Sequence, residues 1–172
     1  MAASALAAGA DAAVYYGKRE ALAAAFPEAD EIETRRFFLT EEQRDRVQEL
    51  AKAPLRDRLI TAHVGKKGDA ILGYAFLETH DVRTVQETLL IVVSPGGKVS
   101  KILLAAFYEP PEYEPPKRWL KQFEGAGLAP DLRVNRRIRG IAGSTLTAQA
   151  VTSGVRRVLA LYELLVRPEE KE

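Results

Sequence analysis

Four strand-like segments in the middle of this chain are grouped into two pairs by short turn signals. Residues 59–64 and 70–77 flank GKKGD (residues 65–69), and residues 87–94 and 98–107 flank SPGG (residues 94–97). Glycine-rich turns between apolar segments of this length predict β-hairpins. Two adjacent hairpins predict an antiparallel sheet as the framework of the fold, with residues 78–86 as a polar crossing between them.

Helical patterns lie on both sides of these hairpins. Residues 18–26 are rich in helix formers and stop at Pro27, residues 31–39 alternate like a strand, and residues 40–51 are expected to form a helix. Thr40 and Gln43 have the spacing of a capping box. Residues 147–166 carry apolar side chains at helical spacing, which predicts a helix with one buried face. The sequence therefore predicts a single α+β domain, in which N-terminal helices and a long C-terminal helix pack on the sheet.

We expect the chain to consist of a leader at residues 1–14, a domain of the α+β type described above at residues 15–168 and a polar tail at residues 169–172. The leader is rich in alanine and contains Ala5-Leu6-Ala7, a small-x-small pattern of the kind that signal peptidases cleave. It lacks the charged and apolar regions of a complete signal peptide. Two interpretations stay open from these residues, the remnant of a secretory signal and a disordered alanine-rich leader.

Composition excludes several classes of protein. The chain has no cysteine, which excludes disulfides, thiolate catalysis, cysteine-ligated zinc and iron–sulfur clusters. Its 25 basic and 24 acidic residues give a formal net charge of +1, which argues against a globally basic nucleic-acid binder. No apolar run approaches the ~20 residues that span a bilayer.

The segment GIAGSTLT (residues 140–147) directly precedes the long helix. Free backbone N–H groups and the helix dipole favour an anion at such a position, and hydroxyl side chains can contact a phosphate there. The alternative interpretation is that Ser144 or Thr145 is only an N-cap. The segment has neither the lysine nor the spacing of a Walker A loop.

The longer segment GSTLTAQAVTSGVRR (residues 143–157) is similar to the GATxTS…AV stretch of the FMN-binding domain family. Such domains occur in the flavin-carrying subunits of the sodium-pumping NADH:quinone reductase and of the Rnf complex, and in many extracytoplasmic single-domain proteins. A second match is the order GYAF (residues 73–76), PGGKV (residues 95–99) and YEPPEY (residues 108–113), which looks like the family's hairpin and the ETPG-type loop beside its flavin. The resemblance spans roughly residues 18–163.

The resemblance implies roles for individual residues. The family's threonine that carries FMN through a phosphoester, attached by a flavin transferase, corresponds to Thr145, and Gly143 matches the glycine of the motif. Ser144 stands where the family has alanine, Ala142 where it has serine or threonine, and Arg139 where it has an acid that the transferase reads. These departures favour noncovalent FMN over covalent attachment at Thr145. Leu146 and Thr147 complete the candidate phosphate-binding segment.

Other candidate residues lie outside this motif. Four arginines in RVNRRIR (residues 133–139), among them Arg139, suit a phosphate, a solvated surface or a docking patch for an acidic partner. Tyr108 and Glu109 are expected beside the isoalloxazine ring. The alternatives are that Tyr108, Tyr113, Trp119 and Phe123 anchor the proline-rich loop, and that Glu109 is solvated. Arg83 completes the set of candidate FMN-binding residues. His80, in the same polar segment, is expected to be structural.

Together these observations predict an electron-transfer flavoprotein domain that relays electrons between redox proteins through FMN. It is expected to be a carrier without a small-molecule substrate of its own, located in the periplasm or otherwise outside the cytoplasm, and in contact with a membrane redox complex. It is expected to have no membrane span and to bind neither metal nor nucleic acid. The alternative is a flavin-free member of the same fold that serves as a structural or docking subunit of such a complex.

Overall fold

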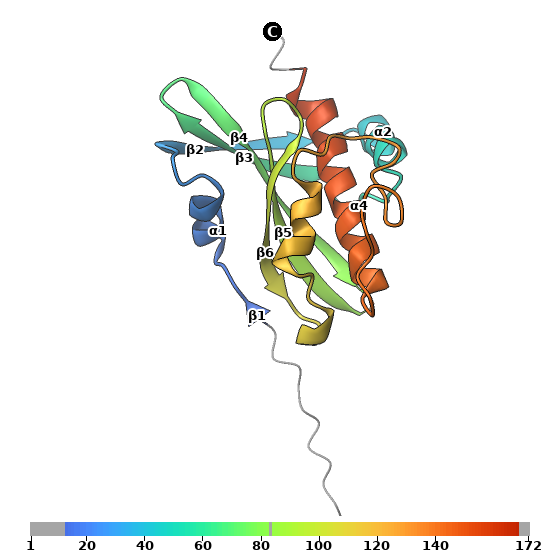
Figure 1. Cartoon of the computed structure of the whole chain (residues 1–172). Helices are drawn as coiled ribbons and strands as arrows, with labels where there is room; N and C mark the ends of the chain where they lie inside the picture. Colours follow the sequence, from blue (N-terminus) through green and yellow to red (C-terminus); the bar gives the residue numbers. More distant parts are fainter. Residues whose placement is uncertain (1–12, 83, 169–172) are drawn as a thin grey trace, which may run out of the picture.

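The computed structural model describes residues 13–82 and 84–168. Within these residues a six-stranded antiparallel sheet has the strand order β1-β6-β5-β4-β3-β2 (Figure 1). Its strands are β1 (Ala13–Val14), β2 (Glu31–Phe38), β3 (Leu59–Lys67), β4 (Ala70–Val82), β5 (Val85–Val93) and β6 (Val99–Phe107). The helices are α1 (Lys18–Ala25), α2 (Glu41–Ala51), α3 (Lys117–Leu120) and α4 (Thr145–Leu161), with 3-10 turns η1 (Pro111–Tyr113) and η2 (Lys121–Phe123) and the π-helical end η3 (Tyr162–Val166). The predicted α+β fold, with helices on an antiparallel sheet and a long C-terminal helix, is confirmed.

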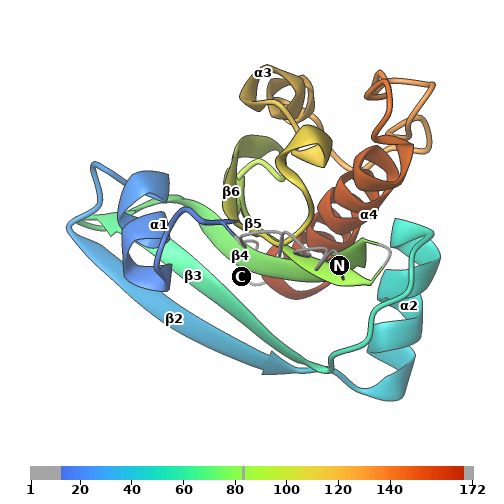
Figure 2. The same ribbon diagram turned by 90° about the horizontal axis from the view of Figure 1, so that it is seen from below.

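Helices cover both faces of the strongly curved sheet. Helix α1 lies against one face, whereas α4, with α2 beside it, lies against the other (Figures 1 and 2). Side chains on a strand alternate between the two faces. Accordingly, Tyr74 and Phe76 belong to the main core on the α4 side, and Ala75 between them belongs to the smaller core under α1.

A hydroxyl residue stands at the N-cap position of each of the two longer helices, α2 and α4. Thr40 caps α2, because its Oγ1 accepts from the Gln43 N–H at 3.1 Å and the Gln43 side chain accepts from the Thr40 N–H at 3.0 Å. The predicted capping box is therefore confirmed. Helix α4 begins at Thr145, two residues before the predicted start, with Ser144 at the N-cap position.

The prediction of a polar crossing at residues 78–86 is wrong. Strand β4 continues to Val82 and β5 begins at Val85, so the two strands form a long hairpin in which His80 is paired with Glu87. The polar side chains belong to this sheet because they find partners across it. For example, the Thr79 and Thr88 hydroxyls are 3.0 Å apart.

The described residues include only the end of the predicted leader and none of the predicted tail. The predicted leader lies outside the described residues except for Ala13 and Val14, which pair with Phe107 and Ala106 of β6. The predicted tail at residues 169–172 also lies outside them. No helix in the described part of the chain is long and apolar enough to cross a bilayer.

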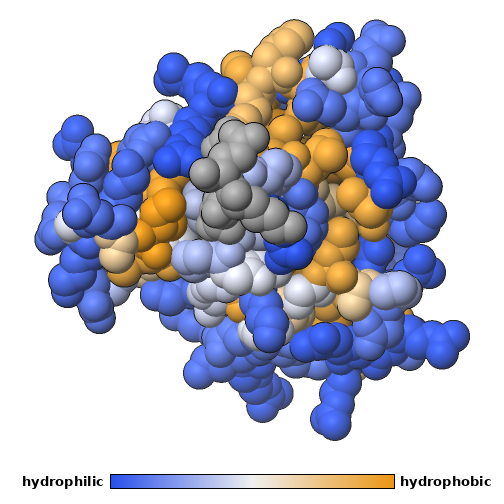
Figure 3. Space-filling view, turned by 90° about the horizontal axis from the view of Figure 1, so that it is seen from above, coloured by the Kyte–Doolittle hydropathy of each residue, from blue (hydrophilic) through white to orange (hydrophobic). Residues whose placement is uncertain are grey.

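Large apolar side chains that remain exposed are distributed over several elements. They are Val14, Tyr15, Phe38, Leu59, Tyr108 and Leu146. The face seen in Figure 3 has the same mixed character, with hydrophilic residues around smaller hydrophobic areas. Phe38 and Leu59 are register partners on β2 and β3, and Val14 and Tyr15 are consecutive in the chain. Exposed apolar groups of this size are normal for folded proteins and do not by themselves mark an interface.

Candidate functional site

The start of α4 presents an unusual N-cap. Ser144 is only 3% exposed, yet its side chain makes no capping hydrogen bond, and its Oγ has no partner among the described residues. The first backbone bond of the helix runs from the Ala148 N–H to the Ser144 carbonyl at 3.0 Å. The N–H groups of the first turn therefore have no acceptor within the helix, as at every helix start. The Ser144 side chain satisfies none of these N–H groups, so they stay available to an anion at the helix start.

The three residues that follow Ser144 differ in their exposure to solvent. Thr145 is exposed, and Leu146 is 49% exposed. Thr147 is buried, and its hydroxyl donates to Glu109 Oε2 over a long 3.5 Å. Two predicted site residues that are 38 positions apart in the sequence are thus brought together, Glu109 from the loop after β6 and Thr147 from α4.

The loop that leads into α4 is held through the backbone of Arg139. Trp119 Nε1 donates to the Arg139 carbonyl at 2.6 Å, and the Arg139 N–H donates to Gln122 Oε1 at 3.0 Å. The Arg139 side chain itself is exposed. Trp119 and Phe123 are buried and pack edge to face with ring centroids 5.3 Å apart. These two aromatics therefore anchor the segment after the proline-rich loop.

A cleft of about 600 Å³ runs along one side of α4. Its other walls are β3, β4, Gln86 of β5 and the segment between α2 and β3. Helix α4 contributes Ala150, Ser153 and Arg157, which share one helical stripe with Leu146 in the first turn. Apolar wall residues are Leu55, Leu59, Ile60, Phe76, Leu77, Val158 and Leu161. The volume and the mixed walls match a site for a small organic ligand.

A buried ion pair lies in the cleft wall. Arg157 Nε donates to Glu78 Oε1 at 3.0 Å, and Arg157 Nη2 bonds the same oxygen. Arg157 Nη1 also makes a long bond of 3.5 Å to the Pro54 carbonyl. This arginine therefore connects α4 to the sheet and to the segment before β3, so it fixes three walls of the cleft relative to one another.

His80 and Glu87 form a second buried polar pair beside the first. His80 Nε2 is 3.1 Å from Glu87 Oε2, and the two side chains are 8% and 1% exposed. Burial raises the pKa of Glu87, although His80 opposes this shift. Burial alone would lower the pKa of His80, but the carboxylates of Glu78 and Glu87 outweigh it and the net direction is upward.

The remaining predicted residues lie around this region without lining the cleft. Tyr108 is 38% exposed, Glu109 is 5% exposed, and neither belongs to the cleft wall. The exposed Gly143 has a φ of 79°, which suits glycine because side chains disfavour that region. Arg83 lies outside the described residues.

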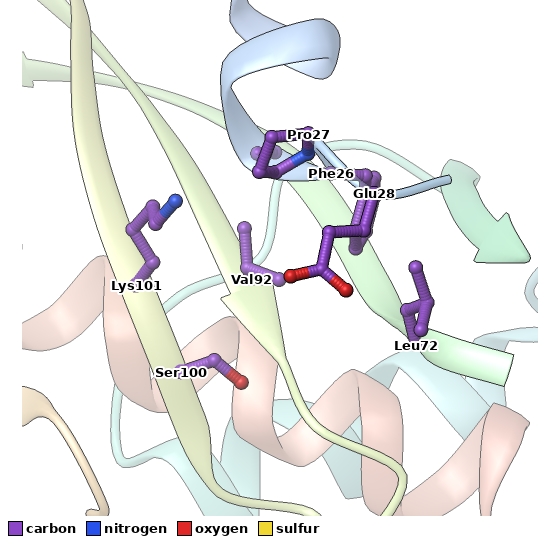
Figure 4. Close-up of a pocket in the computed structure, with 8 residues that line it drawn as sticks. Phe26, Pro27, Glu28, Leu72, Val92, Ser100 and Lys101 are labelled. Carbon is purple, nitrogen blue, oxygen red and sulfur yellow. The ribbon is translucent and has the colours of Figure 1, made fainter. Parts of the chain in front are cut away.

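A second hollow lies on the opposite face of the sheet, under α1. Phe26, Pro27, Leu72 and Val92 line it, and its volume is about 210 Å³ (Figure 4). The nearby Lys101 ammonium already donates to the Ala24 carbonyl at 3.0 Å. This hollow is smaller than the cleft and lacks a comparable buried polar cluster among its lining residues, so it is the weaker candidate.

Glu78, Glu87 and Arg157 were not predicted from the sequence as parts of the candidate site. A usable signal was present, because Glu78 and His80 continue the period-two series that places Tyr74 and Phe76 in the main core. Polar residues in such a series are either paired or functional. Their partners, by contrast, come from a neighbouring strand and from a helix 79 residues away.

Comparison of the chain with protein-family models and with curated proteins gives no match. Among the described residues, no three His, Asp or Glu side chains form a group that could hold a metal ion. The arrangement combines a helix start suited to an anion with a ligand-sized cleft on the same helix. No residue from 143 to 147 lines the cleft, whose nearest lining residue on α4 is Ala150.

Proposed function

We propose that this protein binds FMN, with its phosphate at the start of α4 and its ring system in the cleft, and relays electrons between redox proteins. One observation carries the proposal. The buried, unpartnered Ser144 hydroxyl lies at the start of the same helix that forms a wall of the 600 Å³ cleft. When bound, the flavin would supply the redox chemistry, and the protein would orient it and control access to it.

The residues at the helix start fit a phosphate group. Ser144 Oγ offers a hydroxyl, the first-turn N–H groups offer donors, and the positive end of the helix dipole favours a dianion. Thr145 adds an exposed hydroxyl. No heavy atom outside Gly143 and its neighbours lies within 4 Å of where a Cβ would stand on Gly143, so the approach on that side is open.

The spacing along α4 suits a phosphate joined to a ring by a short chain. Ala150 is five residues after Thr145, which corresponds to about 7.5 Å along a helix. Leu146 lies between them on the same stripe and is half exposed. A ligand anchored at Ser144 and Thr145 can therefore follow this stripe into the cleft, where Phe76 and Leu59 offer apolar contacts.

We expect the flavin to be bound without a covalent bond. The Thr145 hydroxyl is exposed and therefore sterically open to attachment. The exposed Arg139, however, stands where the similar family has the acid that its flavin transferase reads. The same departure favours the second candidate function, a flavin-free docking subunit of a membrane redox complex.

A basic surface supports acidic redox proteins as partners. Residues 117–139 carry seven basic and two acidic side chains, and all seven basic ones are exposed. Within the described residues none of the seven forms an ion pair with a carboxylate. Unpaired surface charge of one sign accelerates encounters with an oppositely charged partner. A location outside the cytoplasm follows from the resemblance alone and belongs to the same proposal.

Titration of flavin fluorescence with the purified protein tests the binding proposal. FMN should bind with its emission quenched, and riboflavin, which lacks the phosphate, should bind roughly 10- to 100-fold more weakly, because about 1.5–3 kcal/mol is lost with a charged hydrogen bond. Ser144→Ala should weaken FMN and leave riboflavin unchanged. Ser100→Ala, on the opposite face beside α1, is the matched control. Equal affinity for the two flavins would contradict the phosphate site, and no binding of either would favour the flavin-free docking subunit.

A further inference from the structure

Strand β2 is one edge of the sheet, and its outer side is open. It is the last strand in the order β1-β6-β5-β4-β3-β2, so no strand among the described residues pairs with that side. Figure 2 shows β2 at the rim of the molecule, with β3 on its inner side. Its eight residues contain no glycine or proline, and its register against β3 has no shift. Prolines and bulges are devices that block an edge, so their absence leaves β2 able to pair with a further strand.

The backbone groups of every second residue of β2 point to the open side. The Leu39 N–H, directly after the strand, donates to the Arg58 carbonyl at 2.8 Å in the β2–β3 ladder. Bonding to a neighbouring strand alternates along an antiparallel ladder, so the odd-numbered residues of β2 bond β3. Ile32, Thr34 and Arg36 therefore direct their N–H and C=O groups outward, where an added antiparallel strand can bind them.

The side chains of β2 change sign along the strand. Glu31 and Glu33 lie in its first half, and Arg35 and Arg36 lie in its second half. Opposite charges in facing positions favour a strand pair, and like charges oppose it. Charged residues usually protect an edge from other strands. A second copy of β2 that runs antiparallel is the exception, because its basic half lies against the acidic half of the first copy.

Symmetry and charge together select one register for such a pair. Facing side chains of antiparallel strands lie on the same face of the sheet, so the two-fold axis passes between one residue and its own copy. An axis at any charged residue of β2 would bring two like charges face to face. An axis at Ile32 would set Glu31 against Glu33 of the second copy. An axis beyond Arg36 would pair only the end of the strand, so Thr34 is the position that remains.

With Thr34 at the axis, the two strands complement each other. Glu33 of each copy faces Arg35 of the other, and the ion pair of 2.9 Å that these side chains make within one strand extends into a network across the axis. Thr34 faces its own copy, which is a favourable cross-strand pair. Ile32 faces Arg36 of the second copy, so the outward backbone groups of both residues also match.

We propose that two copies of this chain associate through β2, antiparallel and with Thr34 at the two-fold axis, so that the sheet continues from one copy into the other. Phe38, which is 71% exposed, then becomes a diagonal neighbour of Ile32 of the second copy, within reach of an aromatic ring. A contact between two edges is small, so the dimer is weak and depends on concentration. No residue of β2 lines the cleft, so this inference does not depend on the proposed function.

Sedimentation equilibrium from micromolar to millimolar protein tests the association. The mass should rise with concentration from 19.0 kDa towards twice that value. Thr34→Pro removes an N–H at the axis but no bond to β3, because that N–H points outward, and it should weaken association roughly 10- to 100-fold. Thr34→Ala is the matched control, because it also loses the contact of the Thr34 hydroxyl with His63 but keeps the N–H, and it should dimerise nearly as well as the unchanged protein. A protein that is monomeric at every concentration, or a dimer that Thr34→Pro leaves intact, would overturn the inference.

A pair of charge variants tests the register. Glu33→Arg and Arg35→Glu each place like charges in facing positions, so neither variant should associate with itself. A mixture of the two should form a heterodimer, because residues 33 and 35 are both basic in one variant and both acidic in the other. Glu49→Arg and Arg46→Glu make the same changes of charge in an exposed ion pair of α2, and each should still dimerise alone.

A mixture of the two folded β2 variants that associates no better than either variant alone would overturn the register and with it the inference. Circular dichroism identifies a variant that does not fold, and the contrast between Thr34→Pro and Thr34→Ala then decides.

Discussion

At the scale of single residues, the ion pair of Arg157 and Glu78 connects α4 to the sheet next to the cleft. Their side chains are only 10% and 11% exposed, so water screens neither charge well. When one partner of a buried pair is removed, the other is left charged in a poorly hydrated site. Loss of either side chain alone should therefore destabilise the walls of the cleft.

We expect Arg157→Met to lower the free energy of unfolding by about 3–5 kcal/mol, measured by urea denaturation. Arg46→Met is the matched control, because Arg46 pairs with Glu49 on the surface of α2, where the two side chains are 53% and 60% exposed. An exposed pair of this kind contributes under about 1 kcal/mol. Similar losses in both variants would contradict the importance assigned to the buried pair.

The lowered pKa of Glu33 on β2 predicts that the free energy of unfolding depends on pH. Hydrogen bonds from Arg35 and then Lys66 lower the pKa of Glu33 from 4.5 to about 2. A carboxyl whose pKa is lowered in the folded state stabilises that state above the unfolded value, and loses this contribution as the pH falls through the folded value. The difference in unfolding free energy between the protein and Glu33→Gln should therefore shrink from pH 4.5 to pH 2. A constant difference over that range would show that Glu33 is not linked to folding.

At the scale of elements, the two long helices start with hydroxyl residues that do different things. Thr40 makes both bonds of a capping box at α2, whereas Ser144 at α4 is buried and makes none with its side chain. A functional capping residue contributes about 1 kcal/mol to stability. A buried hydroxyl without a partner contributes nothing favourable, and its removal is neutral or stabilising.

We therefore expect Thr40→Ala to reduce stability by about 1 kcal/mol and Ser144→Ala to leave it unchanged or slightly increased. Thermal unfolding of the two variants in the absence of flavin measures this contrast. A clear loss of stability in Ser144→Ala would mean that the hydroxyl caps the helix, as the alternative interpretation of the sequence holds. The retention of Ser144 for a ligand would then lose its support.

The sequence was sufficient wherever a local pattern determines an element. The capping box placed α2, and the glycine-rich turns placed the strands on either side of them. It failed at the far half of β4, because polar residues there were interpreted as a loop although Glu87 and Arg157 satisfy them across the fold. The candidate site shows the same division. The start of α4 could be identified from its own residues, whereas the cleft and its buried pairs depend on contacts between distant segments.

At the scale of the whole molecule, charge is distributed unevenly. Residues 117–139 carry a net charge of +5, although the complete chain carries only +1. The other residues of the chain together carry a net charge of about −4, the difference between +1 and +5, so the excess of basic side chains lies in this segment. Such a distribution orients the molecule toward an acidic partner and makes the encounter sensitive to salt.

Reversal of charge in this segment should weaken binding to a negatively charged surface. We expect Arg136→Glu with Arg137→Glu to elute from a cation exchanger at much lower salt than the unchanged protein. Arg44→Glu with Arg46→Glu makes the same change in net charge on α2, where both arginines are paired with acids, and serves as the control. If both double variants eluted together, net charge and not the basic segment would control binding.

The absorbance spectrum of the protein, produced with riboflavin and a flavin transferase and then precipitated with acid, tests the central claim most directly. We predict that the purified protein is yellow and that the colour passes into the supernatant on precipitation, because FMN is held by the start of α4 and the cleft without a covalent bond. Colour that stays in the pellet would mean that FMN is bound covalently, with Thr145 as the attachment site. Thr145→Ala should then abolish the colour of the pellet. A protein that is colourless under these conditions would contradict the account.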